Sequence, residues 1–289
     1  MSIPAKVAVY YGLTKPGIIK GNLLATLAGF LLASAGEIST PLLIWTILGT
    51  SLVIGGACAL NNVLDVEFDK LMTRTKQRVV VTGKISAKSA NIFGFSLTLV
   101  GLLCLVVFVN TLTATIGLIG WVFYVYVYAY AKRNTIYSTL IGGISGATPP
   151  VAGYVAVTNN LDFVAFCLFL ILTCWQIPHF YAISIFRYKE YKNTALPLYV
   201  LKRGISATKL QIMLFCVLLV LFYPALFLIG ATGWVYLFVM GIMSLQWLQS
   251  SLQGLRAKDD TIWAKHQFKL SIRYLSVFCL ILMTEFLLP

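Results

Sequence analysis

Long apolar runs, separated by shorter polar segments, occupy most of the chain. A helix needs about 20 predominantly apolar residues to cross the hydrocarbon core of a bilayer, and nine segments reach about that length. The pattern therefore predicts an all-α, polytopic membrane protein, a bundle of nine transmembrane helices. The predicted spans are residues 17–35, 42–60, 90–109, 113–131, 138–157, 163–183, 210–229, 233–252 and 270–288.

The polar connections between these spans alternate, for the most part, between short and long. The long connections carry most of the charge, and a short turn with Lys132 and Arg133 adds to it. The long connections are residues 61–89, 184–209 and 253–269, and the short uncharged or weakly acidic ones lie near residues 36–41, 110–112, 158–162 and 230–233.

Two of the predicted spans contain proline, which removes a backbone donor and disturbs a helix. We expect Pro149-Pro150 to break the fifth span. Pro178 is expected to kink or locally open the sixth span, so that His179 turns toward the bundle interior. Such interruptions are tolerated where the bundle or a cavity satisfies the freed carbonyl groups.

Composition supports the membrane class and narrows the topology. The chain is 59% hydrophobic and only 11% charged, whereas soluble globular domains carry roughly a quarter charged residues. With nine spans, all 22 Lys and Arg residues fall on one side of the membrane. Because positive charge accumulates in cytoplasmic loops, we predict a cytoplasmic N-terminus and a C-terminus outside. The net charge of +13 is thus a topology signal, and no basic block with interleaved aromatic residues predicts nucleic-acid binding.

No feature indicates a second domain, and residues 1–289 are interpreted as a single transmembrane unit. The N-terminal segment lacks the long apolar core and the small-residue cleavage site of a cleavable signal peptide. The six cysteines lie in or beside apolar spans and form no Cys-x-x-Cys pair. They are expected to be small buried hydrophobes rather than disulfides or metal ligands.

The first long connection contains the clearest candidate chemistry. Asn62, Asp65 and Asp69 follow the second span at i, i+3 and i+7, positions that share one face if the helix continues. Mg²⁺ is held by one or two carboxylates together with substrate phosphates. The spacing therefore predicts a catalytic metal–diphosphate site in which the two aspartates bind the metal and Asn62 adds a neutral oxygen. Glu67 points off this face and is interpreted as structural.

Basic residues follow these acids directly. Arg74 and Arg78 are spaced i, i+4, with Lys76 between them, and guanidinium groups bind phosphate through paired hydrogen bonds. We predict that these three residues neutralise a diphosphate. The alternative interpretation is a solvated, salt-bridged loop after a helix.

The second long connection contains a histidine near the end of the sixth span. His179 can act as an acid or base, a metal ligand or a hydrogen-bond donor; the alternative is a core histidine with satisfied hydrogen bonds. If the helix continues, His179 and Glu190 share a face and can support a second metal. Arg187 and Lys189 either bind phosphate or an acidic substrate, or only anchor the topology.

Charged residues near the ends of the other spans point less specifically to a function. Lys132 and Arg133 end the fourth span on the same side as the acids. Asp259 and Asp260 are interpreted as caps of the last long helix, and His266 as an interfacial residue.

A carboxylate–Mg²⁺–diphosphate site at the mouth of an apolar bundle suits an isoprenyl diphosphate. Metal and arginine stabilise the charge that develops on the leaving diphosphate, and a dry cavity protects the allylic cation from water. We therefore expect a central apolar cavity open toward the cytoplasmic side.

Several stretches resemble the UbiA-type intramembrane prenyltransferases and, within them, the branch that farnesylates heme. The resemblance covers essentially the whole chain. It implies that farnesyl diphosphate and heme b are substrates, that heme O is the product, and that terminal oxidases or a heme A synthase receive it. It also implies a bacterial cytoplasmic (inner) membrane with the active site facing the cytoplasm. The matching stretches are LTKPGIIKGNLLAT, NNVLDVEFDKLMTRTKQR, YAYAKRNTIYSTLIGGISGATPPVAGY, WQIPHFYAISIFRYKEYKNTALPLYV and DDTIWAKHQFKLSI.

The resemblance also assigns roles to individual residues. In the second motif most of the family has several aspartates, whereas this chain has His179 near the first such position and Glu190 near the last. That departure suits the heme branch, makes His179 a candidate for heme recognition, and leaves open whether Glu190 holds a second Mg²⁺. The other carried-over residues are Asn62, Asp65 and Asp69 for the metal and diphosphate, Arg74 and Arg78 for its basic tail, Lys15 and Asn22 for the first span, and the pair Lys132 and Arg133.

Two other functions remain as alternatives. A prenyltransferase for a quinone precursor or another aromatic acceptor has the same fold, but the second motif, depleted in aspartate, argues against it. An ion-coupled transporter places acids near the membrane midplane and often contains repeats. Here the acids gather at one mouth, and no repeat is evident.

Overall fold

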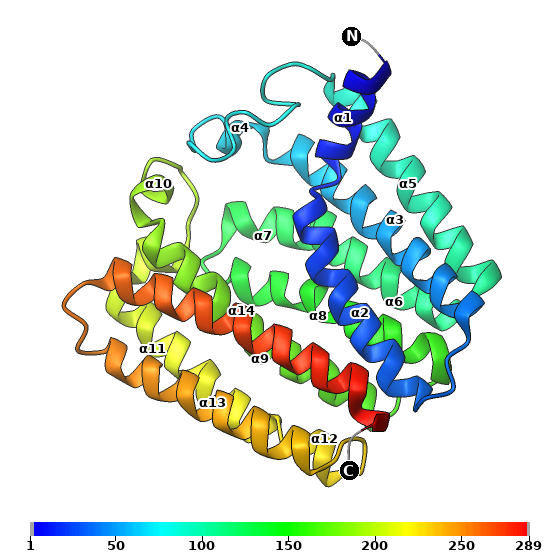
Figure 1. Cartoon of the computed structure of the whole chain (residues 1–289). Helices are drawn as coiled ribbons and strands as arrows, with labels where there is room; N and C mark the ends of the chain where they lie inside the picture. The colour runs from blue at the N-terminus through cyan, green and yellow to red at the C-terminus, as the bar shows by residue number, and fades with distance from the viewer. Residues whose placement is uncertain (1–2, 288–289) are drawn as a thin grey trace.

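The computed structural model describes residues 3–287, and within that range the chain is helical, with no strand (Figure 1). The helices are α1 (Ile3–Leu13), α2 (Pro16–Ser34), α3 (Thr40–Leu64), α4 (Val66–Asp69), α5 (Ala87–Phe108), α6 (Thr111–Val122), α7 (Tyr128–Asn134), α8 (Ser138–Thr158), α9 (Phe163–Phe186), α10 (Tyr188–Lys192), α11 (Tyr199–Phe222), α12 (Ala225–Leu228), α13 (Trp234–Gly254) and α14 (Asp260–Thr284). A π-helical turn, Phe123–Val127, joins α6 to α7, and a 3₁₀ turn, Glu285–Leu287, follows α14.

The prediction of nine spans is confirmed for the part of the chain that the structure describes. Nine helical segments there are long and apolar enough to cross a membrane. Two boundaries were wrong by about ten residues: the helix of the seventh span, α11, begins at Tyr199, and that of the ninth span, α14, begins at Asp260. Helix formation needs only local hydrogen bonds, so charged residues continue the helix past the apolar run. Asp259 caps α14 as predicted, because its side chain accepts from the backbone N–H groups of Thr261 and Ile262.

The charged connections gather on one side of the bundle. In Figure 1, α1 lies at the top, α4 and α10 lie to its left and the connection between α13 and α14 is at the left edge, whereas α12 and the C-terminal end of α14 lie at the bottom. This arrangement agrees with the one-sided charge distribution of the sequence. Which side faces the cytoplasm stays a prediction.

The proline pair does not break the fifth span, so that prediction was wrong. Helix α8 is continuous through Pro149 and Pro150. Proline at position 149 removes the usual N–H donor to the carbonyl of Ser145, and the hydroxyl of Thr148 donates to that carbonyl instead, at 2.9 Å. Helix α9 likewise runs through Pro178 to Phe186.

Helices α2 and α8 contact each other backbone to backbone. A Cβ atom on Gly153 would lie 1.9 Å from the carbonyl oxygen of Thr26, and one on Gly29 would lie 2.0 Å from that of Pro150. Small residues allow such close approach in membrane bundles, where van der Waals packing replaces the hydrophobic effect between helices. These glycines therefore set the distance between the first and fifth spans.

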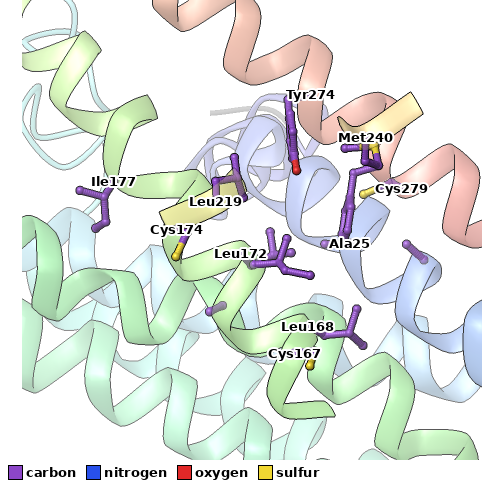
Figure 2. Packing of buried hydrophobic residues seen from close by; sticks show 14 of the residues in the cluster. Ala25, Cys167, Leu168, Leu172, Cys174, Ile177, Leu219, Met240, Tyr274 and Cys279 are labelled. Carbon is purple, nitrogen blue, oxygen red and sulfur yellow. The ribbon is translucent and has the colours of Figure 1, made fainter. Parts of the chain in front are cut away.

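Helices α8, α9, α11, α13 and α14 form the main buried core together with part of α2. Figure 2 shows Leu168 and Leu172 of α9 in this core, with Leu219, Met240 and Tyr274 from α11, α13 and α14. All six cysteines are free thiols, and five of them are buried. The interpretation as small buried hydrophobes is thus confirmed for five cysteines, whereas Cys104 is only half-buried.

Candidate functional site

The second span ends one residue before the first of the two predicted metal-binding aspartates. Helix α3 stops at Leu64, and Asp65 adopts φ −93° and ψ 2° before the single turn of α4. The prediction of one continuous helix through Asp69 was therefore wrong. The guanidinium of Arg133 on α7 donates to the last carbonyl of α3, that of Leu64, and this contact compensates for the interrupted helix. Even so, the N–H of Asp69 still donates to the carbonyl of Asp65 at 2.9 Å.

Both aspartates are buried, and each is paired with one cation. The ammonium of Lys132 lies 2.9 Å from Oδ2 of Asp65, and a guanidinium nitrogen of Arg78 lies 2.5 Å from Oδ2 of Asp69. The aspartates are each only 4% exposed. A buried carboxylate is costly unless it is paired, so these contacts explain how two acids are accommodated at the end of an apolar helix.

A third cation reaches the same region from the first span. Lys15 has the left-handed conformation φ 52°, ψ 68° immediately before α2, and its ammonium donates to Oδ1 of Asn61 at 2.6 Å. Burial lowers the pKa of Lys15 to about 8, and the positive charge of Arg78 acts in the same direction. We refer to Lys15, Asn61, Asp65, Asp69, Arg78 and Lys132 together as the carboxylate–cation cluster.

Asn62 has a more structural position than predicted. Its amide nitrogen donates to the carbonyl of Leu13 at 2.8 Å and to that of Cys58 at 3.1 Å. Asn62 therefore ties the end of α1 to α3, and only its amide oxygen is left to serve a metal.

The π-helical turn brings aromatic residues beside the cluster. The N–H of Tyr128 donates to the carbonyl of Phe123, five residues earlier, which changes the helical phase after that turn. The hydroxyl of Tyr124 lies 3.4 Å from Oδ1 of Asn61, and its ring stacks on that of Tyr128 with centroids 5.9 Å apart. Tyr124, Tyr128 and Lys132 thus present two rings and an ammonium along one side of the fourth span.

Two buried polar atoms of the cluster lack a hydrogen-bond partner: Oδ1 of Asp65 and Nδ2 of Asn61. Leaving such an atom unsatisfied costs about 1–3 kcal/mol, so each is a reason to expect a ligand. No group of three or more His, Cys, Asp or Glu side chains within residues 3–287 is arranged to hold a metal alone. Two carboxylates supplemented by phosphate oxygens are, however, the usual donors for Mg²⁺, and the residues present fit that ion.

Several predicted site residues lie outside this cluster. Arg74, Lys76 and Lys189 are exposed. The amide nitrogen of Asn22 donates within α2, to the carbonyl of Ile18, at 2.9 Å. Glu67 is exposed, which agrees with its interpretation as a residue off the metal-binding face.

The second loop also departs from a continuous helix. Arg187, with φ −104° and ψ 16°, separates α9 from α10. The helix does not continue to Glu190, so the condition under which His179 and Glu190 were expected to share a face is not met. Arg187 instead pairs with Oε1 of Glu190 at 2.9 Å, while Oε2 of Glu190 is buried without a partner. Glu190 thus keeps one free oxygen for a ligand.

His179 lies among aromatic side chains of α9 and α14. Its ring stacks on Trp175 with centroids 5.1 Å apart and lies 5.0 Å from the ring centroid of Phe268. Its Nδ1 is 2.7 Å from the hydroxyl oxygen of Ser271. We refer to Trp175, His179, Phe268 and Ser271 as the histidine cluster.

The sequence interpretation missed four residues of these two clusters, Asn61, Trp175, Phe268 and Ser271, and also the stacked pair Tyr124 and Tyr128 beside the first cluster. The repeated Tyr124, Tyr128 and Lys132 at four-residue spacing was a usable signal, as was the Asn61-Asn62 pair. Nothing local distinguishes Ser271.

An apolar hollow of about 450 Å³ lies apart from both clusters. It is bounded by α1, α2, α3 and α5, and its lining includes Tyr10, Thr14, Gly55 and Phe93. Neither aspartate of the carboxylate–cation cluster lines it, so the predicted central cavity and its opening stay predictions.

Comparison with known proteins gives one consistent result. The model of the UbiA prenyltransferase family matches residues 22–273. A protein from Yersinia pseudotuberculosis serotype O:1b (strain IP 31758), named protoheme IX farnesyltransferase, is 46% identical over 264 residues, 91% of this chain and 90% of the relative.

Solved structures share the fold at low sequence identity. A structure described in work on digeranylgeranylglyceryl phosphate synthase in membranes has a TM-score of 0.82 at 19% identity and covers 98% of this chain and 99% of its own. A UbiA homolog from Archaeoglobus fulgidus, bound to GPP and Mg²⁺, has a TM-score of 0.67 at 14% identity, covering 96% of this chain and 99% of its own.

Proposed function

Because the chain belongs to the UbiA prenyltransferase family, we propose that it transfers a farnesyl group from farnesyl diphosphate to a vinyl group of protoheme IX (heme b). Diphosphate is released, and the product is heme O. The observation that carries the proposal is the carboxylate–cation cluster, in a chain 46% identical to a protoheme IX farnesyltransferase over most of its length.

The cluster is suited to hold the diphosphate of the donor. Lys15, Arg78 and Lys132 supply three positive charges, each now directed at an oxygen atom of Asn61, Asp69 or Asp65. When a diphosphate enters, these cations turn to its oxygens and leave the two carboxylates free for Mg²⁺. The ion, when bound, neutralises the diphosphate and makes it a better leaving group. A UbiA homolog of the same fold binds GPP together with Mg²⁺, which supports this assignment.

Aromatic rings beside the cluster suit the cationic character of the reacting carbon. The stacked pair of Tyr124 and Tyr128 adjoins Asn61, and aromatic faces attract positive charge. We assign these rings the stabilisation of the allylic centre after the bond to diphosphate weakens.

The acceptor is assigned to the histidine cluster. A porphyrin is a flat, largely apolar molecule with a metal at its centre. Trp175 and Phe268 offer aromatic surface, and His179 offers a ring nitrogen that can bind iron. Glu190 and Arg187, on the adjacent α10 segment, are candidates for the polar edge of the acceptor or for a second Mg²⁺. Heme b is thus a substrate and no resident prosthetic group.

The topology follows from the charge distribution. The side with α4 and α10 is proposed to face the cytoplasm of a bacterial inner membrane, because positive charge accumulates in cytoplasmic loops. The product would then be available to a terminal oxidase or to a heme A synthase.

The test is an analysis of extracted hemes and quinones after expression in a host that lacks its own heme farnesyltransferase. Heme O that accumulates with the wild-type chain, and not with Asp69→Asn at matched expression, supports the proposal. Accumulation of a prenylated quinone precursor without heme O would contradict the assignment of the acceptor and favour the quinone alternative.

A further inference from the structure

Ser271 makes two hydrogen bonds that together determine the protonation of His179. Its Oγ lies 2.7 Å from Nδ1 of His179 and 2.6 Å from the carbonyl oxygen of Phe268, one turn earlier on α14. A serine hydroxyl has a single proton to donate and lone pairs to accept with. The carbonyl oxygen can only accept, so it takes the serine proton. Nδ1 of His179 must then carry a proton and donate it to Ser271.

The surroundings of Ser271 hold this geometry in place. Ser271 is fully buried, and its backbone carbonyl accepts a hydrogen bond from the indole N–H of Trp175 at 2.7 Å. The same indole stacks on the ring of His179. Ser271 thus contacts both members of the stacked pair, through its side chain and its main chain, and links α14 to α9.

The other ring nitrogen is open to a ligand. Nε2 of His179 makes no hydrogen bond with any residue in the described range 3–287, and it is not one of the buried atoms left without a partner. It therefore reaches accessible space. With the proton on Nδ1, Nε2 carries an unshared electron pair.

We propose that Ser271 is a positioning residue that holds His179 in the Nδ1-protonated tautomer, so that Nε2 offers its electron pair to the iron of the acceptor. Metal-binding histidines commonly donate their second ring N–H to an oxygen acceptor, which sets both tautomer and orientation. The identity of the ligand rests on the proposed function, whereas the tautomer does not. The same tautomer prevents neutral His179 from donating a proton through Nε2.

The tautomer is tested on the full-length protein in detergent, without heme, after labelling with ¹⁵N-histidine. The chain has only two histidines, and the exposed His266 is assigned by His266→Gln. We expect a pyrrole-type nitrogen shift for Nδ1 of His179 and a pyridine-type shift for Nε2. The reverse pattern in the wild-type protein overturns the proposal.

Variants of the serine test its role in setting the tautomer. Ser271→Ala removes the acceptor and is expected to move the ¹⁵N pattern toward a mixture of tautomers, whereas Ser271→Thr keeps the hydroxyl and the wild-type pattern. The matched control is Ser251→Ala, a fully buried serine on α13 whose hydroxyl donates to the carbonyl of Leu248 at 2.7 Å. An unchanged pattern in Ser271→Ala overturns the proposal. If Ser271→Ala does not fold, the wild-type pattern still decides the tautomer.

Titration with ferric heme b tests the ligand. We expect an axial-imidazole absorption spectrum that is lost in His179→Phe, and a heme affinity roughly 10–100-fold weaker in Ser271→Ala, the usual effect of removing the partner of a metal-binding histidine. Ser251→Ala should match the wild type. Equal heme affinity in the wild type and Ser271→Ala overturns the proposed role. Absence of heme O from cells with the wild-type chain contradicts the proposed function instead, because the ¹⁵N pattern is recorded without heme.

Discussion

Replacement of Asp65 by Asn isolates the charge of one carboxylate from its shape. Asp65 is 4% exposed, accepts from Lys132 at 2.9 Å through Oδ2, and has no partner for Oδ1. Asn has the same size and retains an oxygen that Lys132 can bond. The substitution therefore removes the negative charge proposed to hold Mg²⁺ while preserving most of the local packing.

The substitution should lower both the free energy of unfolding and the rate of farnesyl transfer, and the two changes differ enough in size to be measured separately. Removing one partner of a buried ion pair costs about 3–5 kcal/mol, but the Lys132 side chain is 16% exposed and keeps a hydrogen bond to the amide. The free energy of unfolding should then fall by only about 1 kcal/mol, a decrease in melting temperature of about 2–4 °C. Loss of a preorganised charge at the leaving group should cost about 3–4 kcal/mol in the transition state, a rate decrease of about 10²–10³-fold.

The assay measures heme O formed from farnesyl diphosphate and heme b in detergent, with thermal unfolding of the same preparations. Glu67→Gln is the matched control, because Glu67 is an exposed acid only two residues away. We expect nearly wild-type activity for Glu67→Gln and almost none for Asp65→Asn, at similar melting temperatures. Activity above about one-tenth of wild type in Asp65→Asn, a loss below roughly 1.4 kcal/mol, would refute the metal assignment, as would equal losses in both variants.

Three further predictions address the fold and the donor site. Gly153→Ala should prevent the close contact of α2 with α8, because the added Cβ would lie 1.9 Å from the carbonyl oxygen of Thr26, and it should lower the melting temperature strongly. The control is Gly17→Ala, whose added Cβ would have no atom within 4 Å and should leave the melting temperature unchanged. Equal melting temperatures of the two variants would contradict the described packing. Removal of divalent cations by a chelator should abolish transfer and added Mg²⁺ should restore it; activity that persists in excess chelator argues against a metal. Burial lowers the pKa of Lys15 to about 8, so Lys15 loses its charge above that pH. The KM for farnesyl diphosphate should therefore rise from about pH 8 upward in the wild type and stay independent of pH in Lys15→Met. A wild-type KM that does not change up to pH 9 would exclude a role of Lys15 in binding the diphosphate. The free energy of unfolding should change in the opposite direction and increase with pH above about 8. The unfolded chain keeps the proton of Lys15 up to the ordinary pKa of lysine, so the penalty for burying the charged side chain is present below pH 8 and is relieved above it.

The distribution of apolar residues accounts for most of the architecture. A helix that crosses a bilayer must satisfy its own backbone and present an apolar surface, and both requirements are local. The nine spans and the one-sided placement of Lys and Arg could therefore be predicted. The boundaries at Tyr199 and Asp260 could not, because a helix that leaves the hydrocarbon needs no apolar residues to continue.

The candidate site was predicted in its composition and only partly in its geometry. Asp65 and Asp69 were predicted to bind a metal ion, which stays a prediction; in the structure they pair with Lys132 and Arg78, and Arg74 is exposed. Where α3 ends, Lys132 and Arg133 contact Asp65 and the carbonyl of Leu64 from a segment almost 70 residues away. No property of residues 61–78 alone contains that information.

Local sequence by itself determined the nine spans, the class of the protein and the residue types that can hold a metal and a diphosphate. Tertiary structure alone decided which of these residues meet. Lys132 is 67 positions from Asp65, and Ser271 is 92 positions from His179. Helical periodicity relates residues three or four positions apart, whereas contacts between spans depend on how closely backbones approach. In this chain that approach is set by glycines such as Gly29 and Gly153 at the contact of α2 with α8.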